Sequence, residues 1–354
     1  MLKMGGLPKR VIVFLLAILA FSYLWMKFEK IEIKVIGQSR QTGILQSDFE
    51  EPFFKNLAKN TGLPVKVNYY PFDTTGFRDE FQLKMLKANQ LDLVSLRMLQ
   101  NQSSEPMLMG LDLPGMSYSL TNAKAIADVY FPVLNDQLVK VHNSKLLGLW
   151  TFGPQVFFCN FPIKELQDLI GRKIRVGNEI YNGPLIALNA IPVVIHFDEV
   201  EYALQKKIID CAITSKGSAA AAGWLNHTTH VFPLPMQMGI NAYVINNNLW
   251  NQFSDKQKIE MQKAFDLLVR EMWEKADFLD QEYSRCMSGK QLCPGNKVYK
   301  LTEVKPLKQD YKTMRNLFSK ISLENWITQC ELQRPGCKSE WIATIQPVLQ
   351  KNLD

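Results

Sequence analysis

Stretches with the hydrophobic periodicity of β-strands alternate along the chain with stretches that have the periodicity of helices. The stretch IEIKVIG at 31–37 alternates in the manner of a β-strand, in which every second side chain shares one face. The next segment, 47–62, indicates a helix that Ser47 can cap at its start and Gly62 at its end. Read in this way, the chain contains predicted strands at 31–37, 64–70, 91–97, 146–153, 155–161, 173–176, 191–197 and 208–214. The predicted helices are 47–62, 79–90, 120–143, 163–170, 183–189, 198–207 and 254–287.

The order of these elements predicts an α/β fold with two lobes. Strands and helices alternate in both halves, which is typical of parallel strands joined by helical crossovers. Extended crossovers join the two units, so we expect a cleft between lobe I, residues 31–150, and lobe II, residues 151–245. The remaining part, 246–354, is expected to hold a long helix and a C-terminal helical region that partly returns to lobe I. At 1.5 Å per residue that helix approaches roughly 50 Å, enough to run along both lobes.

Length and charge narrow the class of protein. The chain has 354 residues, of which 47% are hydrophobic and 21% charged, an ordinary globular balance. The formal net charge is +7, and the first thirty residues contribute four of these charges. Because the remainder carries only +3 and has no dense basic stripe interleaved with aromatics, the sequence argues against nucleic-acid binding.

The N-terminal residues 1–30 have the pattern of an export leader. Lys3, Lys9 and Arg10 precede an apolar run from Val11 to Met26, which is typical of a signal peptide. The run is shorter than the ~20 residues of a comfortable transmembrane helix. No small-residue cleavage site follows it, so an uncleaved membrane anchor is the alternative interpretation. Both interpretations place the rest of the chain outside the cytoplasm.

Six cysteines agree with an oxidising compartment. Two pairs, Cys286 with Cys293 and Cys330 with Cys337, each share the spacing C-x6-C around a Gly or Pro. This spacing is too wide for a zinc knuckle and favours two local disulfides, although crossed pairing among the four also fits. The remaining two, Cys159 and Cys211, fit equally a third disulfide or two buried thiols.

Signatures of enzymes are scarce in the sequence. No GxSxG, P-loop, GxGxxG or HExxH motif occurs, and we expect no catalytic residue, metal or cofactor. The stretch HFDEVE at 196–201 places His196 near two carboxylates, which could suggest a metal site. Asp198 as a helix N-cap, with acidic residues favoured by the helix dipole, explains the same residues without a metal.

Arg175 interrupts the apolar positions of the strand KIRV at 173–176. Ile174 and Val176 indicate one buried face, so the guanidinium points to the other side. One interpretation is an ion pair that braces the lobe. The other is a fork for a ligand carboxylate, since arginine presents fixed parallel donors to two oxygens.

Several motifs in chain order resemble one family. The stretches PIKELQDLIGRKIRV, IPVVIHFDEVEYALQKKIID and LDLPGMSY, followed by the long helix after NNLWNQFSDKQ, are similar to the solute-binding proteins of tripartite ATP-independent periplasmic (TRAP) transporters, the DctP family. The resemblance covers residues 31 to about 320. It implies a two-lobed periplasmic-binding-protein fold with mixed sheets, helical crossovers and a long helix that bridges both lobes.

The resemblance also implies a binding site. The arginine of the KIRV strand grips the ligand carboxylate in this family, which points to Arg175, and the Phe before the SEVY-like helix start packs on the ligand, which points to Phe197. By approximate register, Gln38 and Asp79 occupy polar contact positions, although a loop residue and an N-cap are the alternative interpretations. Trp150 and Phe152 add an apolar wall or simply pack in the core.

This chain departs from the family pattern at three positions. Gln155 stands where the family often has a second arginine, Thr214 where asparagine commonly binds the ligand, and Arg97 where some relatives carry glutamate. One cation has therefore gone and another enters from the opposite lobe. The site is expected to bind an anionic ligand without reproducing the usual sialic acid or C4-dicarboxylate pattern.

The resulting hypothesis is a non-enzymatic binding protein in the periplasm, either free or held at the inner membrane by its leader. It captures a small organic acid and delivers it to the small and large permease subunits of a TRAP transporter. The alternative is a membrane-anchored sensory or scaffold protein on the same fold, which the missing cleavage site and the altered pocket would suit.

Overall fold

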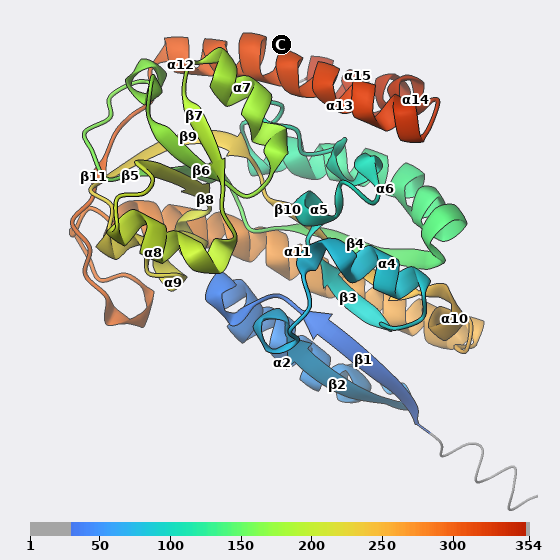
Figure 1. Cartoon of the computed structure of the whole chain (residues 1–354). Helices are drawn as coiled ribbons and strands as arrows, with labels where there is room; N and C mark the ends of the chain where they lie inside the picture. Colours follow the sequence, from blue (N-terminus) through green and yellow to red (C-terminus); the bar gives the residue numbers. More distant parts are fainter. Residues whose placement is uncertain (1–29, 352–354) are drawn as a thin grey trace, which may run out of the picture.

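Two mixed sheets, one in each lobe, form the framework of the molecule (Figure 1). The computed structural model describes residues 30–351. The strand order is β2-β1-β3-β10-β4 in the first sheet and β11-β9-β5-β8-β6-β7 in the second. The predicted leader, residues 1–30, lies outside the described residues except for its last position. Of the helices within residues 30–351, none is both long enough and apolar enough to cross a membrane.

The first sheet pairs its N-terminal strands in parallel. β1 lies parallel to both β2 and β3, while β10 is antiparallel to β3 and β4. The strands are β1 (Ile31–Gly37), β2 (Val65–Pro71), β3 (Leu93–Leu96), β4 (Ser144–Thr151) and β10 (Ile240–Asn246). The helices of this lobe are α2 (Glu51–Lys55), α3 (Leu57–Thr61), α4 (Gln82–Lys87), α5 (Met98–Asn101), α6 (Leu120–His142) and α10 (Asn247–Trp250).

The second sheet carries β5 antiparallel to both of its neighbours, β8 and β9, whereas β6 lies parallel to β7 and β8. The strands are β5 (Gln155–Cys159), β6 (Lys173–Val176), β7 (Ile191–Val194), β8 (Cys211–Thr214), β9 (His230–Gln237) and β11 (Thr302–Glu303). The helices of this lobe are α7 (Asn182–Ala187), α8 (Val200–Gln205) and α9 (Lys216–Ala221).

Two extended connections join the sheets. One, 152–154, leads from β4 to β5, and the other, 238–239, leads from β9 back to β10. Each contains a glycine at positive φ, Gly153 at 93° and Gly239 at 62°, a conformation that other residues adopt at a cost. Because β10 belongs to the first sheet although it falls within 151–245, we propose that the lobes divide at these two connections.

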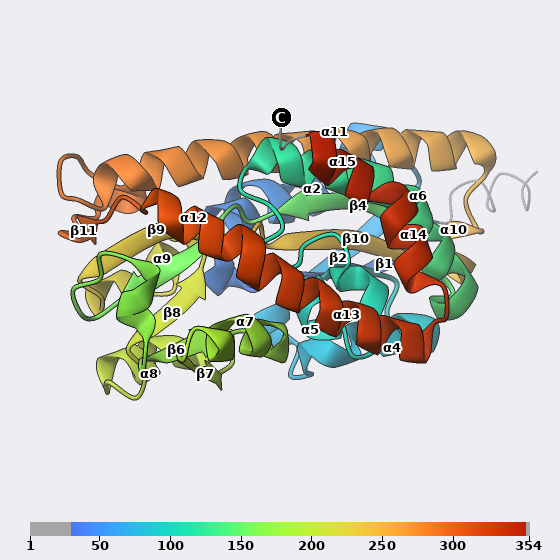
Figure 2. The ribbon, with the colours of Figure 1, turned by 90° about the horizontal axis from the view of Figure 1, so that it is seen from above.

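The long predicted helix is α11 (Asp255–Cys286), and it runs along both lobes (Figure 2). Ser254 and Gln257 form a capping box at its start, which satisfies backbone donors that have no helical partner. Its first half packs on lobe I, where Gln262 donates to the carbonyl of Leu147 at 2.8 Å. Its second half contacts lobe II, where the Asp280 carboxylate lies 3.1 Å from the buried ammonium of Lys216 on α9. The expected bridging helix is confirmed.

A second helical path crosses the lobes near the C-terminus. It consists of α12 (Lys308–Thr313), a π-helical segment (Met314–Phe318) and α13 (Ser319–Gln333), followed by α14 (Cys337–Thr344) and α15 (Gln346–Lys351). Met314 and Phe318 are buried in the core of lobe II, whereas Trp326 is buried in the core of lobe I. Accordingly, α13 contacts α7 of lobe II and the 3₁₀ turn Pro106–Met109 of lobe I.

Most predicted elements are present, with shifted ends. The helix predicted at 47–62 begins at Leu45 with a π-helical turn and is interrupted at Asn56, whose backbone leaves the helical region. The helix predicted at 163–170 is wrong: only a 3₁₀ turn, Leu166–Leu169, forms there. Glu165, in an extended conformation, and Asp168 form a capping box that fixes this short turn.

Three disulfides cross-link segments of the described chain. They join Cys159 to Cys211, Cys286 to Cys293 and Cys330 to Cys337. The two local pairs confirm the prediction from the C-x6-C spacing. Cys159 and Cys211 stand opposite each other on the paired strands β5 and β8, so the first of the two alternatives, a third disulfide, is the correct one.

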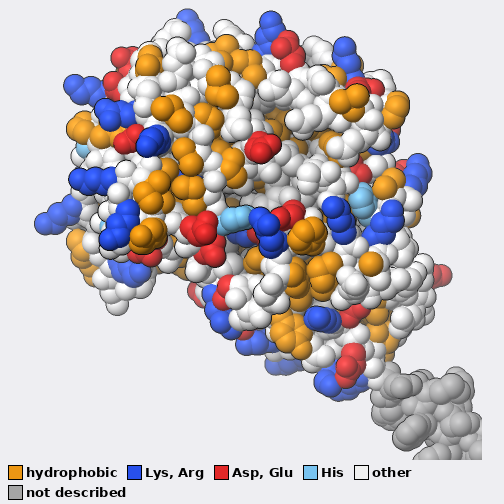
Figure 3. All heavy atoms as spheres, viewed as in Figure 1, with side chains coloured by type: hydrophobic (Ala, Val, Ile, Leu, Met, Phe, Trp, Pro, Cys, Tyr) orange, Lys and Arg blue, Asp and Glu red, His pale blue; other side chains and the backbone are white. Residues whose placement is uncertain are grey.

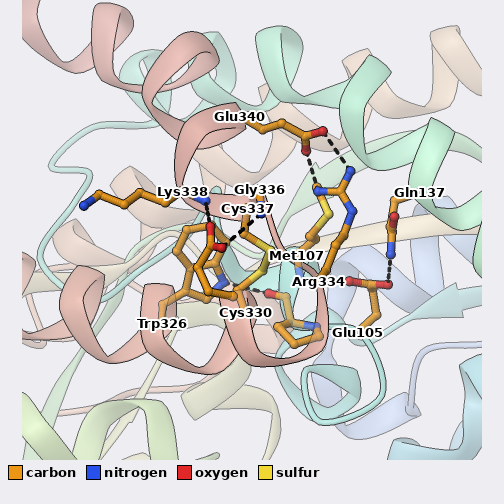
Figure 4. Close-up of a disulfide and its surroundings, with 12 residues drawn as sticks. Glu105, Met107, Gln137, Trp326, Cys330, Arg334, Gly336, Cys337, Lys338 and Glu340 are labelled. Carbon is orange, nitrogen blue, oxygen red and sulfur yellow. Dashed lines mark hydrogen bonds and ion pairs between the residues drawn. A yellow bond between two sulfur atoms is a disulfide. The ribbon is translucent and has the colours of Figure 1, made fainter.

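The Cys330–Cys337 disulfide ties the end of α13 to the start of α14 (Figure 4). Around it, Arg334 and Glu340 form two ion-paired hydrogen bonds of 2.5 and 2.8 Å. Trp326 donates to the carbonyl of Pro106 at 2.7 Å, and Trp341 donates to that of Gly110 at 2.7 Å. The C-terminal helices are thus fixed to lobe I by a covalent bond and two buried indole hydrogen bonds.

Replacing Cys330 and Cys337 together by alanine is expected to lower the free energy of unfolding by about 2.5 kcal/mol, because the disulfide no longer restricts an eight-residue loop in the unfolded chain. Denaturant unfolding of the two proteins measures the difference. The matched control removes Cys286 and Cys293, which are equally buried and enclose a loop of the same length. The chain-entropy explanation predicts similar losses for both variants, and a stability unchanged from the wild type would contradict it.

Candidate functional site

A cavity of about 90 Å³ lies where the two lobes and their connections meet. Its walls come from the ends of strands in both sheets, as expected for a site between α/β lobes. Lobe I contributes Thr42, Arg97, Leu99 and Asp112. Lobe II contributes Arg175, Tyr181, Phe197, Thr214 and Gln237, and the connections contribute Phe152, Gln155 and Gly239.

Arg175 occupies β6 with its guanidinium on the cavity side. Ile174 and Val176, on either side of it, are fully buried in the core of lobe II, so the strand is fixed by its apolar face. Only 4% of Arg175 is exposed. Its Nε donates to the carbonyl of Ile195 at 2.9 Å and its Nη1 to that of Ile213 at 3.3 Å. These two backbone acceptors orient the guanidinium but carry no charge.

No Asp or Glu within residues 30–351 forms an ion pair with Arg175. Burial lowers the pKa of Arg175 to about 10; the positive charge of Arg97 acts in the same direction, whereas Tyr181 and the carboxylate of Asp198 act in the opposite one. The group therefore stays protonated at neutral pH, and no carboxylate of the described residues lies within ion-pairing distance of it. This arrangement disfavours the interpretation of Arg175 as half of a bracing ion pair, since the expected partner is absent from the described chain.

An aromatic pair lies beside the Arg175 guanidinium. The rings of Phe197 and Trp224 are 5.1 Å apart, and the guanidinium carbon lies 5.9 Å and 5.4 Å from their respective centroids. Cation–π attraction and the loss of water on this side both restrict the guanidinium. Trp224 belongs to a short 3₁₀ turn after α9, in a stretch, AAAAGWLNH, whose pattern gave no sign of a role at the site.

Arg97 and Asp79, both predicted as site residues, form an ion pair. Arg97 follows β3, Asp79 opens the turn before α4, and Nη1 of Arg97 lies 2.6 Å from Oδ2 of Asp79. Both side chains are nearly buried, with 12% and 11% exposed. Arg97 lines the inner cavity and also a second, outer cavity of about 420 Å³, whereas Asp79 lines only the outer one.

Of the other predicted site residues, Thr214 and Gln155 line the inner cavity, whereas Gln38 does not. Thr214 ends β8 and is 6% exposed, and the Gln155 amide donates to the carbonyl of Gly153 at 2.8 Å. The Gln38 side chain is fully buried behind β3, where it donates to the backbone oxygen and the hydroxyl of Ser95 at 3.0 and 3.1 Å. Because these bonds turn its amide away from both cavities, we leave Gln38 out of the proposed site.

Asp112 is a buried cavity residue that was not identified from the sequence. Its Oδ1 accepts from the backbone N–H of Met238 at 2.8 Å and its Oδ2 from that of Ile240 at 3.0 Å. The amide of Gln237 donates to the backbone oxygen of Asp112, and the hydroxyl of Tyr181 donates to Gln237. This network fixes the β9–β10 connection, and burial raises the pKa of Asp112 to about 6 despite the hydrogen bonds.

The lobes touch each other directly around the cavities. Asn178 of lobe II donates to the carbonyl of Leu99 at 3.1 Å, and Ser218 donates to that of Thr42 at 3.2 Å. At the outer edge, Nη2 of Arg78 lies 3.3 Å from Nε2 of His196. The space-filling view shows charged side chains of both signs along this junction (Figure 3). The two lobes are therefore in direct contact in this structure.

His196, which the HFDEVE stretch places near two carboxylates, belongs to no cluster of potential metal ligands among the described residues. Across residues 30–351, no group of three or more His, Cys, Asp or Glu side chains is placed to hold an ion. The His196 ring instead faces the guanidinium of Arg78. What the cleft offers is an oriented cation, an aromatic wall and uncharged polar groups, which suits noncovalent binding of a small anion.

Two lobes that close on a cavity with an oriented guanidinium define a solute-binding protein. The family model of the DctP proteins, described as bacterial extracellular solute-binding protein, family 7, matches residues 38–323. This chain is a member of that family, which binds solutes outside the cytoplasm and is not enzymatic. The resemblance seen in the sequence is thereby confirmed.

Individual relatives are distant in sequence. The sialic acid-binding periplasmic protein SiaP of Vibrio cholerae is 21% identical over 238 residues, which cover 65% of this chain and 72% of SiaP. DctP7 of Bordetella pertussis, an extracytoplasmic solute receptor that binds pyroglutamic acid, superposes with a TM-score of 0.77 at 12% identity, covering 90% of this chain and 99% of its own. A TRAP periplasmic solute-binding protein of Rhodoferax ferrireducens with bound malonate gives 0.76 at 17% identity, covering 91% and 99%. These likenesses confirm the two-lobed fold.

Proposed function

We propose that this protein captures a small organic acid between its lobes and holds the carboxylate on Arg175. The observation that carries the proposal is the guanidinium at the cavity wall, which is buried, oriented by backbone carbonyls and without an ion-pair partner among the described residues. A buried charge without a counter-charge is costly, and a ligand carboxylate would remove that cost while gaining charge-assisted hydrogen bonds. The relatives named above bind sialic acid, pyroglutamic acid and malonate, each of which carries a carboxyl group.

The neighbouring residues have supporting roles in this proposal. Phe197, with Trp224 behind it, would cover the apolar side of the ligand. Thr214 and Gln155 would donate or accept hydrogen bonds at its polar groups, because both line the inner cavity. Arg97 and Asp79 would contact the end of the ligand that points away from Arg175.

Capture follows from closure of the lobes. A ligand in the inner cavity touches residues of both lobes only in the closed form, so its binding shifts the population toward that form. The hydrogen bonds from Asn178 to Leu99 and from Ser218 to Thr42 join the two lobes directly and would further stabilise the closed form. We propose that the closed protein acts in the periplasm and delivers its ligand to the membrane subunits of a TRAP permease, which reopen the cleft.

A thermal-shift screen of the full chain in mild detergent tests the proposed ligand class. The panel holds pyroglutamate, malonate, L-malate and short hydroxy acids, each beside its uncharged amide. At a hundredfold excess over Kd, a true ligand adds about 2.7 kcal/mol of stability, which raises the melting temperature of a chain of this length by roughly 4 °C. We expect carboxylates and not their amides to do so. A panel without such a hit, or equal shifts from the amides, would refute binding through the carboxylate.

A further inference from the structure

Arginines from both lobes face the inner cavity, but they differ in their partners. Arg97 is ion-paired with Asp79 at 2.6 Å, whereas among residues 30–351 Arg175 forms hydrogen bonds to backbone carbonyls and no ion pair. We infer that the Arg97–Asp79 ion pair makes the site selective for acids with a single carboxylate and excludes acids with two. This inference rests on the proposed function and deepens it, because it names the class of acid.

The ion pair is held firmly in place. Asn101 donates to the backbone oxygen of Asp79 at 3.0 Å and to that of Arg97 at 3.0 Å, which fixes the two residues relative to each other. The Arg97 guanidinium also lies 5.8 Å from the ring centroid of Phe72. A second ligand carboxylate could bind Arg97 only by displacing Asp79 or by lying beside it. Both are unfavourable, since like charges in a water-poor cleft repel strongly.

The free oxygen of Asp79 favours a different ligand group. Its Oδ1 is buried and has no hydrogen-bond donor within residues 30–351. A buried acceptor without a donor is unfavourable, and a hydroxyl or N–H of a ligand would satisfy it. The position that repels a second carboxylate therefore attracts a neutral donor. Hydroxy acids and lactam acids with one carboxylate combine both required groups.

The outer cavity adds to the exclusion of a second carboxylate. A ligand too long for the inner cavity extends past Arg97 and Phe197, which line both cavities. The outer walls carry more negative than positive side chains, and the charged members apart from His196 are Asp73, Asp79, Asp198, Glu199, Arg78 and Arg97. Of the two arginines, Arg78 is already paired with Glu80 at 3.0 Å. The distal end of the ligand thus meets net negative charge next to the rings of Phe72 and Phe77.

The inner cavity offers no further cation that could bind a second carboxylate. Apart from the two arginines, its only charged residue among the described residues is Asp112. Both Asp112 carboxylate oxygens accept backbone N–H groups of the β9–β10 connection. Arg175 is therefore the one cation of the inner cavity, among the described residues, that has no carboxylate within ion-pairing distance.

Calorimetry with matched acids tests the inference on the full chain in detergent. The pairs are 2-hydroxybutyrate with L-malate and butyrate with succinate, in which a methyl group replaces one carboxylate. We expect the wild type to bind the monocarboxylate of each pair at least about tenfold more tightly. Asp79→Asn keeps the shape but frees the charge of Arg97, so it should tighten binding of the dicarboxylates at least about tenfold and abolish or reverse the preference.

Two controls make the result specific. Asp128→Asn removes an exposed carboxylate of α6, outside the cleft, and should leave the preference unchanged. The double variant Arg97→Gln/Asp79→Asn should lose the dicarboxylate binding gained by Asp79→Asn alone, because no second cation of the described residues is left at the inner cavity.

The inference would be overturned if the wild type bound dicarboxylates equally well or more tightly, or if Asp79→Asn kept the wild-type preference. Binding that still depended on Arg175 would leave the proposed function intact in either case. If neither these acids nor pyroglutamate bind, both the proposed function and the inference are wrong.

Discussion

Replacing Arg175 by alanine is expected to weaken carboxylate binding by about 100-fold or more. Charge-assisted hydrogen bonds contribute about 1.5–3 kcal/mol each, and about 1.4 kcal/mol corresponds to a tenfold change in Kd. Arg175 is buried and has free donor capacity toward the cavity, so its loss leaves the ligand carboxylate without its charged partner in a water-poor site. Calorimetry with the acid that gives the largest thermal shift measures the change.

Arg172→Ala is the matched control for this experiment. Arg172 lies three residues earlier, is exposed, and its guanidinium stacks 4.1 Å from the ring of Phe161 outside the cleft. Its removal should leave Kd unchanged. Arg175→Lys keeps the charge but lacks the planar fork and the two backbone bonds, so we expect an intermediate loss. If Arg175→Ala folds as the wild type does and binds within threefold of it, Arg175 is not the anchor.

Above pH 4, Asp112 is expected to make the protein less stable as the pH rises. The pKa of this carboxyl is raised by burial from its ordinary 3.8 to about 6 in the folded protein. The folded state thus binds the proton more tightly than the unfolded chain does, and the resulting stabilisation is complete below pH 4. It is lost as the pH rises to about 6 and above, and the difference in pKa corresponds to about 3 kcal/mol at most.

The Asp112→Asn variant isolates this contribution. Glu50 and Asp280 also have pKa values raised by burial, so the wild type loses stability over the same range for several reasons. Asparagine resembles the protonated carboxyl and does not titrate. Denaturant unfolding of both proteins between pH 4 and pH 7 should therefore show a difference in stability that changes with pH, by up to about 3 kcal/mol in favour of the variant at the upper end. A difference that stays constant would show that Asp112 keeps an ordinary pKa.

The local elements of the fold follow from patterns within short stretches. The alternation around Arg175 predicted β6 at 173–176 with the observed bounds, because successive side chains of a strand point to opposite faces whatever the rest of the chain does. The bridging helix could likewise be predicted from the sequence, since Ser254 caps a long stretch without Gly or Pro. Both short-range disulfides followed from their spacing.

Other features of the fold depend on contacts between distant segments. The strand β10 follows β9 after only two residues but joins the other sheet, between β3 and β4. Its own residues, INAYVIN, are buried in any central strand and do not specify which sheet receives it. The helix predicted at 163–170 also failed, since a capping box fixed a short turn where the apolar spacing suggested a longer element.

The features of the binding site likewise fall into those that short stretches of sequence predict and those that depend on contacts between distant segments. The sequence by itself determined the family and the strand of Arg175, because these depend on motifs and on alternation along single segments. It also pointed to Phe197, Thr214 and Gln155, which line the inner cavity and whose contact with a ligand stays a prediction. Only the tertiary structure decided that Arg97 is neutralised by Asp79, that Asp112 holds the β9–β10 connection and that Gln38 is turned into the core. The physical reason is that the charge and hydrogen-bond state of a buried group depends on its partners. Those partners lie 18 residues away for Arg97 and 57 for Gln38, and more than 120 for Asp112.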